Sequence, residues 1–272
     1  MHNSPELREA ILTLENAGVP SPRHDAEVLW VFADGIVPTF KELVGQRAQR
    51  IPLQHITGSA HFRYLELEVG PGVFIPRPET ELLAQVAIDE LKNSQNKIAV
   101  ELCAGSGAMA ISMATEVPGA QVYAVEKSLD AFRWLELNAE IYAKEIQAMG
   151  SSLTVIHGDA TEVRDLQELV GTVTVVVSNP PYIPDAMVPK EPEVRDHDPY
   201  MALFGGSDGF DIARGVIQVA QQLLVPGGVF GMEHADVQGE SVKELLVGWS
   251  DVVDHADYNQ LPRYVTARLA TT

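Results

Sequence analysis

The stretch Glu101-Leu102-Cys103-Ala104-Gly105-Ser106-Gly107 decides the fold, because it follows an apolar strand pattern and precedes a helical one. Small residues at such a turn allow backbone N–H groups and the helix N-terminus to approach a ligand closely. Glu126 ends the next strand pattern, 19 positions after Gly107, where a carboxylate can bind the hydroxyls of a ribose. The spacing favours a nucleoside-containing ligand over an ordinary structural turn. However, Gly105-x-Gly107-x-x-Ala110 also fits the relaxed dinucleotide fingerprint.

Strand and helix patterns alternate along the chain from residue 97 onward. The run Val173–Val177 is continuously apolar, which is typical of a central strand buried on both faces. Such alternation predicts an α/β fold with a parallel sheet and helices on both faces. The last two strand candidates leave no room for a helix between them, so they should form an antiparallel hairpin at one sheet edge. Helices are expected between the first five strands and at Gln238–Val247. The strand candidates are Ile98–Cys103, Gln121–Glu126, Leu153–His157, Val173–Ser178, Gly228–Glu233, Val252–Tyr258 and Tyr264–Leu269.

The first 58 residues predict a bundle of short helices. Ser4-Pro5 and Ser21-Pro22 each combine an N-cap residue with a proline at the first helical position. A third helix should bury apolar residues between Phe40 and Ala48, and Pro52–Ile56 should add one turn. Because these apolar stripes are small, the bundle is expected to dock on a larger domain.

Between the bundle and the sheet, the pattern predicts a β-hairpin that links two domains. The alternation over Leu65–Val69 is typical of a strand, Gly70-Pro71-Gly72 of a turn, and Val73–Ile75 of a returning strand. The predicted organisation is a helical domain at 1–58, a hairpin linker at 59–76 and an α/β domain at 77–272.

Composition and charge narrow the possible partners. The chain of 272 residues has 38 acidic and 19 basic side chains, and its net charge of −19 is concentrated in residues 76–272, which carry −16. Phosphate backbones bind to clustered Lys and Arg, so direct nucleic-acid binding is not expected. Cys103 is the only cysteine, which excludes an intrachain disulfide. No apolar run approaches the roughly 20 residues of a membrane span, and Met1–Glu6 lacks signal-peptide features, so a cytoplasmic protein is expected.

Asp159 follows the third strand candidate and offers a carboxylate to an adenine amino group. Taken alone, the stronger interpretation is an N-cap for a helix that starts near Glu162. Ligands bind at the carboxyl ends of strands in such sheets. We therefore expect Asp159 to lie along one edge of the sheet with Glu126 and with the turn that contains Glu101 and Gly105.

The run Ser178-Asn179-Pro180-Pro181-Tyr182 follows the fourth strand candidate. Its prolines remove two backbone donors and stiffen the turn, and Asn179 is extended because it precedes a proline. The remaining carbonyls, amide and aromatic ring suit a planar –NH₂ group. Asn179 Oδ1 and the Pro180 carbonyl can accept its two N–H bonds, and Tyr182 can pack on its plane. A proline-rich strand exit with a buried tyrosine is the alternative interpretation.

With these motifs in these places, the chain resembles a class I methyltransferase that uses S-adenosylmethionine. More narrowly, it resembles the release-factor glutamine methyltransferases of the HemK/PrmC family. The resemblance covers almost the whole length, and its most specific part is Ile-Pro-Arg-Pro-Glu-Thr-Glu at Ile75–Glu81. It also rests on Arg50–Gly58, Asn179–Tyr182, Gly205–Gly209 and Glu233-His234.

The resemblance implies a Rossmann-like seven-stranded methyltransferase sheet and a peptide chain release factor as substrate. The methylated atom would be N5 of the glutamine in the Gly-Gly-Gln loop of that factor, the helical domain would help dock the factor, and no metal would be needed. The residues implied for catalysis are Asn179, Pro180 and Tyr182. Those implied for substrate binding are Asn179, Pro180, Pro181 and Tyr182, and those for the cofactor are Glu101, Cys103, Ala104, Gly105, Ser106, Gly107, Glu126, Asp159, Ala160 and Asn179.

The sequence departs from the family pattern at several positions. Glu101 stands where Asp is usual, which moves the charge by one methylene, and Cys103-Ala104 replaces smaller or hydroxylated residues. Ala160 stands where a large side chain often flanks adenine. Asn259 replaces a glycine, and because Asn tolerates positive φ we expect the turn to form there.

Other functions share parts of the pattern. Asn-Pro-Pro-Tyr also occurs in adenine-N6 methyltransferases, but this chain has no Lys/Arg-rich recognition segment. A nicotinamide-dependent oxidoreductase would use the glycine turn and would leave Asn179–Tyr182 without a role. A non-catalytic scaffold that binds S-adenosylmethionine is the third alternative.

The acidic loop after Tyr182, which includes Glu191–Asp198, is long enough to form a flap over the substrate.

Overall fold

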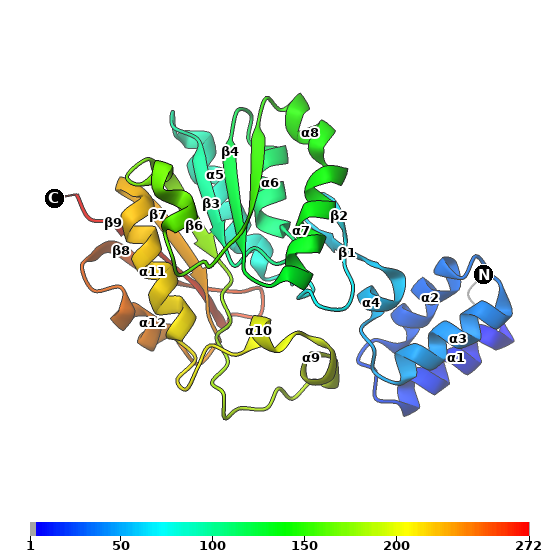
Figure 1. Ribbon diagram of the computed structural model, residues 1–272. Helices are drawn as coiled ribbons and strands as arrows, with labels where there is room; N and C mark the ends of the chain where they lie inside the picture. The colour runs from blue at the N-terminus through cyan, green and yellow to red at the C-terminus, as the bar shows by residue number, and fades with distance from the viewer. Residues whose placement is uncertain (1–3, 272) are drawn as a thin grey trace.

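The computed structural model describes residues 4–271 and arranges them in two lobes (Figure 1). Part of the segment that bears on a signal peptide, Met1-His2-Asn3, lies outside the described residues. The first lobe contains four helices, and the second contains a seven-stranded sheet with helices on both faces. Within residues 4–271, no helix is long and apolar enough to span a bilayer.

The helical lobe has its own small core. Ser4 Oγ accepts the N–H of Leu7 at 3.1 Å, so the predicted cap of the first helix is confirmed. Leu14 and Leu29 are completely buried, and the ring of Trp30 meets the edge of Phe40 at 5.0 Å between centroids. The helices of this lobe are α1 (Pro5–Asn16), α2 (Pro22–Phe32), α3 (Val37–Ala48) and α4 (Leu53–Thr57).

The sheet of the larger lobe has the strand order β5-β4-β3-β6-β7-β9-β8. All neighbouring pairs are parallel except those made by β9, which is antiparallel to β7 and β8. This confirms the predicted fold class and the antiparallel hairpin at the edge. The strands are β3 (Ile98–Leu102), β4 (Gln121–Glu126), β5 (Ser152–His157), β6 (Val173–Ser178), β7 (Leu224–Glu233), β8 (Trp249–Ala256) and β9 (Pro262–Leu269). The chain order reverses between β3 and β6, which is where ligands bind in such sheets.

Each face of the sheet is covered by its own helices. Side chains of β6 alternate between two cores, with Val175 and Val177 in one and Val176 in the other, as expected for a central strand. The first core is covered by α5 (Thr80–Asn93), α6 (Ala108–Glu116), α7 (Leu129–Ile141) and α8 (Ala143–Ala148). The second is covered by η1 (Arg164–Leu169), α11 (Asp211–Leu223) and α12 (Gly239–Leu245). The helix expected between β5 and β6 is therefore only the short 3₁₀ element η1.

The β-hairpin turns earlier in the chain than predicted. β1 (Ser59–Phe62) pairs with β2 (Leu65–Glu68), and the turn is at Arg63-Tyr64. The returning strand predicted at Val73–Ile75 was wrong, because that segment forms no strand. Its two aliphatic side chains are instead buried in the core below α5 and α7. The hairpin contributes to the same core, so it is packed onto the larger lobe.

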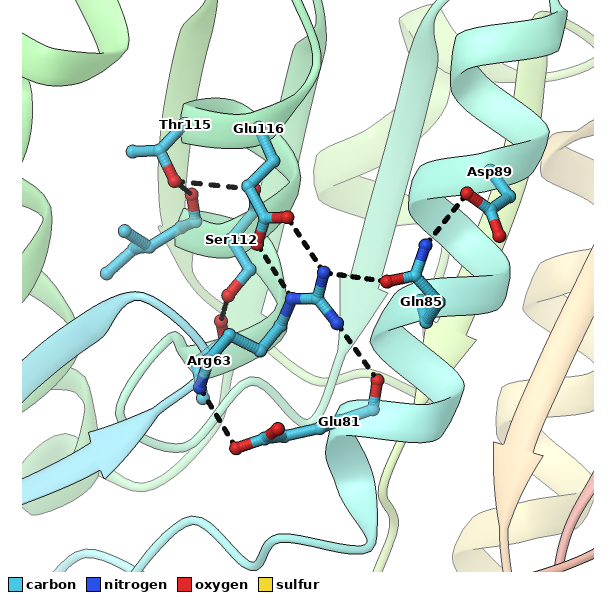
Figure 2. A network of polar contacts seen from close by, with 9 residues as sticks. Arg63, Glu81, Gln85, Asp89, Ser112, Thr115 and Glu116 are labelled. Atoms are coloured by element: carbon cyan, nitrogen blue, oxygen red, sulfur yellow. Dashed lines mark hydrogen bonds and ion pairs between the residues drawn. The ribbon is translucent and has the colours of Figure 1, made fainter.

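Contacts from distant parts of the sequence hold the turn of this hairpin. Arg63 has φ +53, a left-handed conformation that is uncommon for a residue with a side chain. Figure 2 shows its backbone N–H donating to Glu81 and its guanidinium donating to both oxygens of Glu116, each at 2.7 Å. The guanidinium also donates to Gln85 at 2.8 Å. Because α5 and α6 supply these partners, no local turn residue marks the position in the sequence.

Candidate active site

A cavity of about 320 Å³ lies at the carboxyl ends of β3, β4, β5 and β6. This volume falls within the range of small-molecule binding sites. The strand ends that the sequence singled out are thus brought together at one edge of the sheet. The predicted site residues that line the cavity are Glu101, Cys103, Ala104, Gly105, Ser106, Glu126, Asp159, Ala160, Asn179, Pro181 and Tyr182. Gly107 and Pro180 are not among the lining residues.

The two glycines of the first turn have different surroundings. Gly105 has φ +57, and a Cβ added there would meet no atom within 4 Å, so its backbone is open to the cavity. Gly107 has φ +87, and a Cβ there would lie 2.6 Å from Leu135 Cδ1. Gly107 therefore permits close packing of α6 against α7, whereas Gly105 permits a ligand to approach the backbone.

Cys103 has φ +62 although it carries a side chain. The left-handed region costs roughly 1–2 kcal/mol for a residue with a Cβ. We expect Cys103→Gly to unfold with a free energy about 1 kcal/mol higher than Cys103→Ala, since alanine keeps the Cβ and glycine removes it. Urea denaturation of the two variants measures this difference. An alanine variant as stable as the glycine variant would show that the backbone there is not strained.

Glu126 connects the end of β4 to the glycine turn. Its Oε2 accepts the N–H of Gly105 at 2.8 Å, and its Oε1 accepts the N–H of Ser128 at 2.7 Å. Burial raises the pKa of Glu126, and the hydrogen bonds from Ser128 and Gly105 oppose that effect. A carboxylate offers about four acceptor sites, so about two remain for a ligand such as a ribose diol.

Asp159 has more partners within the protein than Glu126. Its Oδ1 accepts the N–H of Thr161 at 2.9 Å and the hydroxyl of Thr161 at 2.7 Å, and its Oδ2 pairs with Lys127 Nζ at 2.7 Å. Burial alone would raise the pKa of Asp159, but the bonds from Lys127 and Thr161 outweigh it and lower the pKa. Asp159 thus stays ionised, caps a turn and retains about one acceptor site for a ligand.

Glu101 lies at the floor of the cavity, where it is 2% exposed. Its Oε2 accepts the N–H of Ala110 at 2.7 Å, which fixes the first turn of α6. Burial raises the pKa of Glu101 to about 8, and the nearby Glu126 carboxylate contributes to this rise. At pH 7 the Glu101 carboxyl group therefore carries a proton in most molecules, and it acts on the turn mainly as a hydrogen-bonding group.

We expect this burial to make folding stability depend on pH. The pKa of Glu101 in the folded state is about 8, above its ordinary value of 4.5, so stability present below about pH 4.5 is lost as pH rises to about 8. Glu101→Gln should remove on the order of 3 kcal/mol of that dependence, as measured by denaturation at pH 5 and pH 8.5. Glu136→Gln, on the exposed surface of α7, is the control. Parallel pH profiles for the parent and Glu101→Gln would contradict the expectation.

The run Asn179–Tyr182 leaves the sheet at the end of β6. Ser178 Oγ donates to the carbonyl of Leu102 at 2.7 Å, which ties this end to β3. Asn179 and Pro181 line the cavity, whereas Pro180 is buried outside its lining. Asn179 thus contributes to the same cavity as the glycine turn.

Tyr182 completes the wall after the two prolines. Burial raises the pKa of its phenol to about 12, so the hydroxyl is neutral. The Tyr182 carbonyl accepts Gln238 Nε2 at 2.9 Å. Gly205 and Gly209 pass directly against the turn: a Cβ on Gly205 would lie 2.5 Å from the Pro181 carbonyl, and one on Gly209 2.3 Å from the Tyr182 carbonyl. The family motif Gly205–Gly209 therefore makes room for the turn.

Sequence reasoning assigned no role to several residues that line the cavity. Phe74 and Pro76 line it from the segment before α5, and Thr80 lines it from the first residue of α5. Arg77 stacks on Phe74 at 4.6 Å from the ring centroid. The sequence marks Ile75–Glu81 only through its resemblance to the family and indicates no role for its side chains. The residues Pro199–Phe204 also line the cavity, whereas those of the acidic stretch Glu191–Asp198 do not, so a flap over the substrate remains a prediction.

The expectation for Asn259 was wrong in detail. The turn forms, but the positive φ of +63 belongs to Gln260 and not to Asn259. Asp257 explains the shape, because its Oδ1 accepts the N–H groups of Asn259 at 2.8 Å and of Leu261 at 3.1 Å. A buried carboxylate thus organises the loop without a glycine.

Among residues 4–271, no group of three or more potential metal-ligating side chains is suitably placed for a metal.

Comparisons with known proteins agree with this arrangement. The family model for the methyltransferase small domain matches residues 65–190. The release factor glutamine methyltransferase of Streptomyces coelicolor is 46% identical over 97% of this chain and 97% of its own length. The enzyme of the same name from Bifidobacterium longum is 41% identical over 96% of this chain and 97% of its own length.

A solved structure shares the fold of the larger lobe. The 16S rRNA N2 G1207 methyltransferase (RsmC) of T. thermophilus, in complex with AdoMet and guanosine, has a TM-score of 0.52 at 22% identity and covers 77% of this chain and 49% of its own. At this identity the likeness shows a Rossmann-like methyltransferase fold, as the sequence predicted. The full-length relatives define the family more narrowly. This chain belongs to the family of release factor glutamine methyltransferases.

Proposed function

We propose that this chain transfers a methyl group from S-adenosylmethionine to N5 of the glutamine in the Gly-Gly-Gln motif of peptide chain release factors. The observation that carries the proposal is that Asn179–Tyr182 and the glycine turn Cys103–Gly107 contribute to one cavity. A substrate nitrogen bound at Asn179–Tyr182 would lie next to the methyl donor bound at Cys103–Gly107. The names of the full-length relatives support the same reaction.

The shape and the polar groups of the cavity suit S-adenosylmethionine. The open backbone at Gly105 accommodates the ligand, Glu126 has acceptor sites left for the ribose, and Asp159 has one for the adenine amino group. Ala160, at the same strand end, leaves space beside the adenine. When bound, this cofactor would supply an electrophilic sulfonium methyl group. The N–CH₃ bond would form as the S–CH₃ bond breaks to leave S-adenosylhomocysteine, and the nitrogen would lose one proton to solvent.

The acceptor turn would prepare the amide nitrogen for attack. Resonance with the carbonyl ties up the lone pair of an amide nitrogen. Asn179 Oδ1 and the Pro180 carbonyl would accept its two N–H bonds, direct the lone pair toward the methyl group, and stabilise the positive charge that develops on nitrogen. Tyr182 would pack on the amide plane. Pro180 is buried outside the cavity lining, so this role requires its carbonyl to become accessible when the substrate binds.

The charge of the site opposes the alternatives. A dinucleotide would place an anionic pyrophosphate near Glu126 and Asp159, with Lys127 as the basic side chain of the lining. A nucleic-acid substrate would meet a lobe with a net charge of −16 over residues 76–272, which opposes phosphate binding. A non-catalytic scaffold would not require the acceptor turn, and turnover distinguishes it from an enzyme.

The experiment that tests the proposal is methyl transfer to a purified release factor, with mass spectrometry locating the methyl group. We expect one methyl group on the glutamine of Gly-Gly-Gln. Methylation elsewhere, or of nucleic acid in place of the factor, would overturn the proposal.

We further propose that the helical lobe, residues 1–58, docks the factor. The intact factor should then have a lower KM than a short Gly-Gly-Gln peptide, and equal values would exclude docking.

A further inference from the structure

The segment at residues 183–204, here called the flap, leaves the acceptor turn and returns to it. Ile183 N–H donates to the Leu203 carbonyl at 2.8 Å, and Gly205 N–H donates to the Ile183 carbonyl at 2.9 Å, so the two ends of the flap are joined. Between them lie α9 (Pro192–His197) and α10 (Tyr200–Leu203). In Figure 1 these helices lie below the sheet, with α9 toward the helical lobe.

Glu193, on α9, pairs with two arginines of the helical lobe. Arg50 donates through Nε at 2.7 Å and through a terminal nitrogen at 2.6 Å, and Arg47 lies at 2.8 Å from the same carboxylate. Burial alone would raise the pKa of Glu193, but the bonds from Arg50 and Arg47 outweigh it and lower the pKa to about 2. The side chain of Glu193 is 18% exposed, so solvent screens this cluster less than a surface pair.

The helical lobe fixes its side of the contact. Arg47 is only 6% exposed, and its Nε donates to Asp25 at 2.7 Å. A second nitrogen of Arg47 donates to the Ile51 carbonyl at 3.1 Å. Arg50 has φ +65, a left-handed conformation that places its guanidinium against Glu193. The two arginines are therefore supported from behind and are not free surface side chains.

The other end of α9 leads directly to the cavity. Asp198 pairs with Arg77 at 2.7 Å, and Arg77 in turn covers Phe74, which lines the cavity. The next residues, Pro199–Phe204, line the cavity, and the rings of Tyr200 and Phe204 stack at 4.5 Å. Glu193 is thus six positions before Pro199, where the continuous run of lining residues begins.

We propose that Glu193 is a positioning residue through which the helical lobe holds Pro199–Phe204 against the cavity. A protein that engages the helical lobe then also acts on the wall of the cavity, and a displaced lobe releases that wall. The inference deepens the proposed function and rests on it only for the identity of the substrate.

The test compares Glu193→Gln with Asp196→Asn in the full-length protein. Asp196 is on the same helix, is exposed, and pairs with its neighbour Arg195, so its variant controls for the loss of one charge. Hydrogen exchange of the backbone amides at 200–204 is measured first. We expect about 10-fold faster exchange in Glu193→Gln, which corresponds to about 1.4 kcal/mol, and no change in Asp196→Asn.

Kinetics separate positioning from simple loss of folded protein. We expect KM for the release factor to rise about 10-fold in Glu193→Gln while kcat stays within about twofold. A lower fraction of folded protein would instead reduce kcat and leave KM unchanged. Glu193→Asp, which keeps the charge, should recover part of the loss. Arg50→Gln should give a smaller change in the same direction, because Arg47 still pairs with Glu193, and the double variant Arg50→Gln with Glu193→Gln should be no worse than Glu193→Gln alone.

Each outcome decides the inference. If exchange at 200–204 in Glu193→Gln equals that in Asp196→Asn, the flap does not depend on the helical lobe and the proposal fails. If exchange rises but KM for a release factor that is methylated does not, the contact is structural only and the positioning role is excluded. If the factor is not methylated at all, the proposed function fails, and exchange together with affinity for S-adenosylhomocysteine still decides the role of Glu193.

Discussion

Asn179→Ala is expected to lower the rate of methyl transfer by about 10²–10³ while cofactor affinity stays near that of the parent. Asn179 follows the last residue of β6 and lines the cavity together with the glycine turn that would bind the cofactor. Its amide oxygen would act on the incoming nitrogen as positive charge develops there. The loss is therefore expected in the transition state, much as when one preorganised oxyanion-hole group is removed.

Asn179→Asp is the sharper comparison. It keeps an acceptor oxygen, adds a negative charge, and loses the –NH₂ donor. We expect activity above that of Asn179→Ala and below that of the parent. Single-turnover methylation at saturating cofactor measures all three proteins, and calorimetric binding of S-adenosylhomocysteine confirms that their cofactor sites are intact. Equal rates for Asn179→Ala and the parent would exclude the proposed mechanism, whatever the substrate.

The parts of the fold that could be predicted are those with local signals. The apolar run in β6 and the small residues at Cys103–Gly107 each describe their own surroundings, so the parallel sheet and the edge that carries the cavity followed from them. The hairpin turn at Arg63 could not be predicted in this way. Its left-handed backbone is stabilised by Glu81 and Glu116, which come from two later helices.

The flap shows the same limit at the site itself. An acidic stretch such as Glu191–Asp198 is usually a solvated surface, and the sequence does not indicate that two of its carboxylates are paired and largely buried. Glu193 pairs with Arg50, which is 143 positions away in the sequence, and Asp198 pairs with Arg77, which is 121 positions away. Such pairings depend on how distant segments of the chain come together in space, so they become visible only once the fold is known.

Glu126→Ala is expected to weaken the binding of S-adenosylhomocysteine by about 100-fold or more, because two charge-assisted bonds to a ribose diol contribute roughly 1.5–3 kcal/mol each. The structure adds a second effect, since the same carboxylate accepts the N–H groups of Gly105 and Ser128. Removing it leaves both N–H groups without their acceptor. The free energy of unfolding without ligand should therefore fall by about 1–3 kcal/mol.

Glu126→Gln separates the two effects. Glutamine keeps one acceptor oxygen in place, so one of the two backbone bonds survives, but its –NH₂ group cannot accept a ribose hydroxyl. We expect affinity for S-adenosylhomocysteine between that of the parent and that of Glu126→Ala, with a smaller loss of stability than in the alanine variant. Calorimetry gives the affinities, and urea denaturation without ligand gives the stabilities. Glu136→Gln, on the exposed face of the helix that follows β4, should change neither. If a folded Glu126→Ala binds the ligand as tightly as the parent, the carboxylate serves the glycine turn alone and the ribose must be bound by other residues.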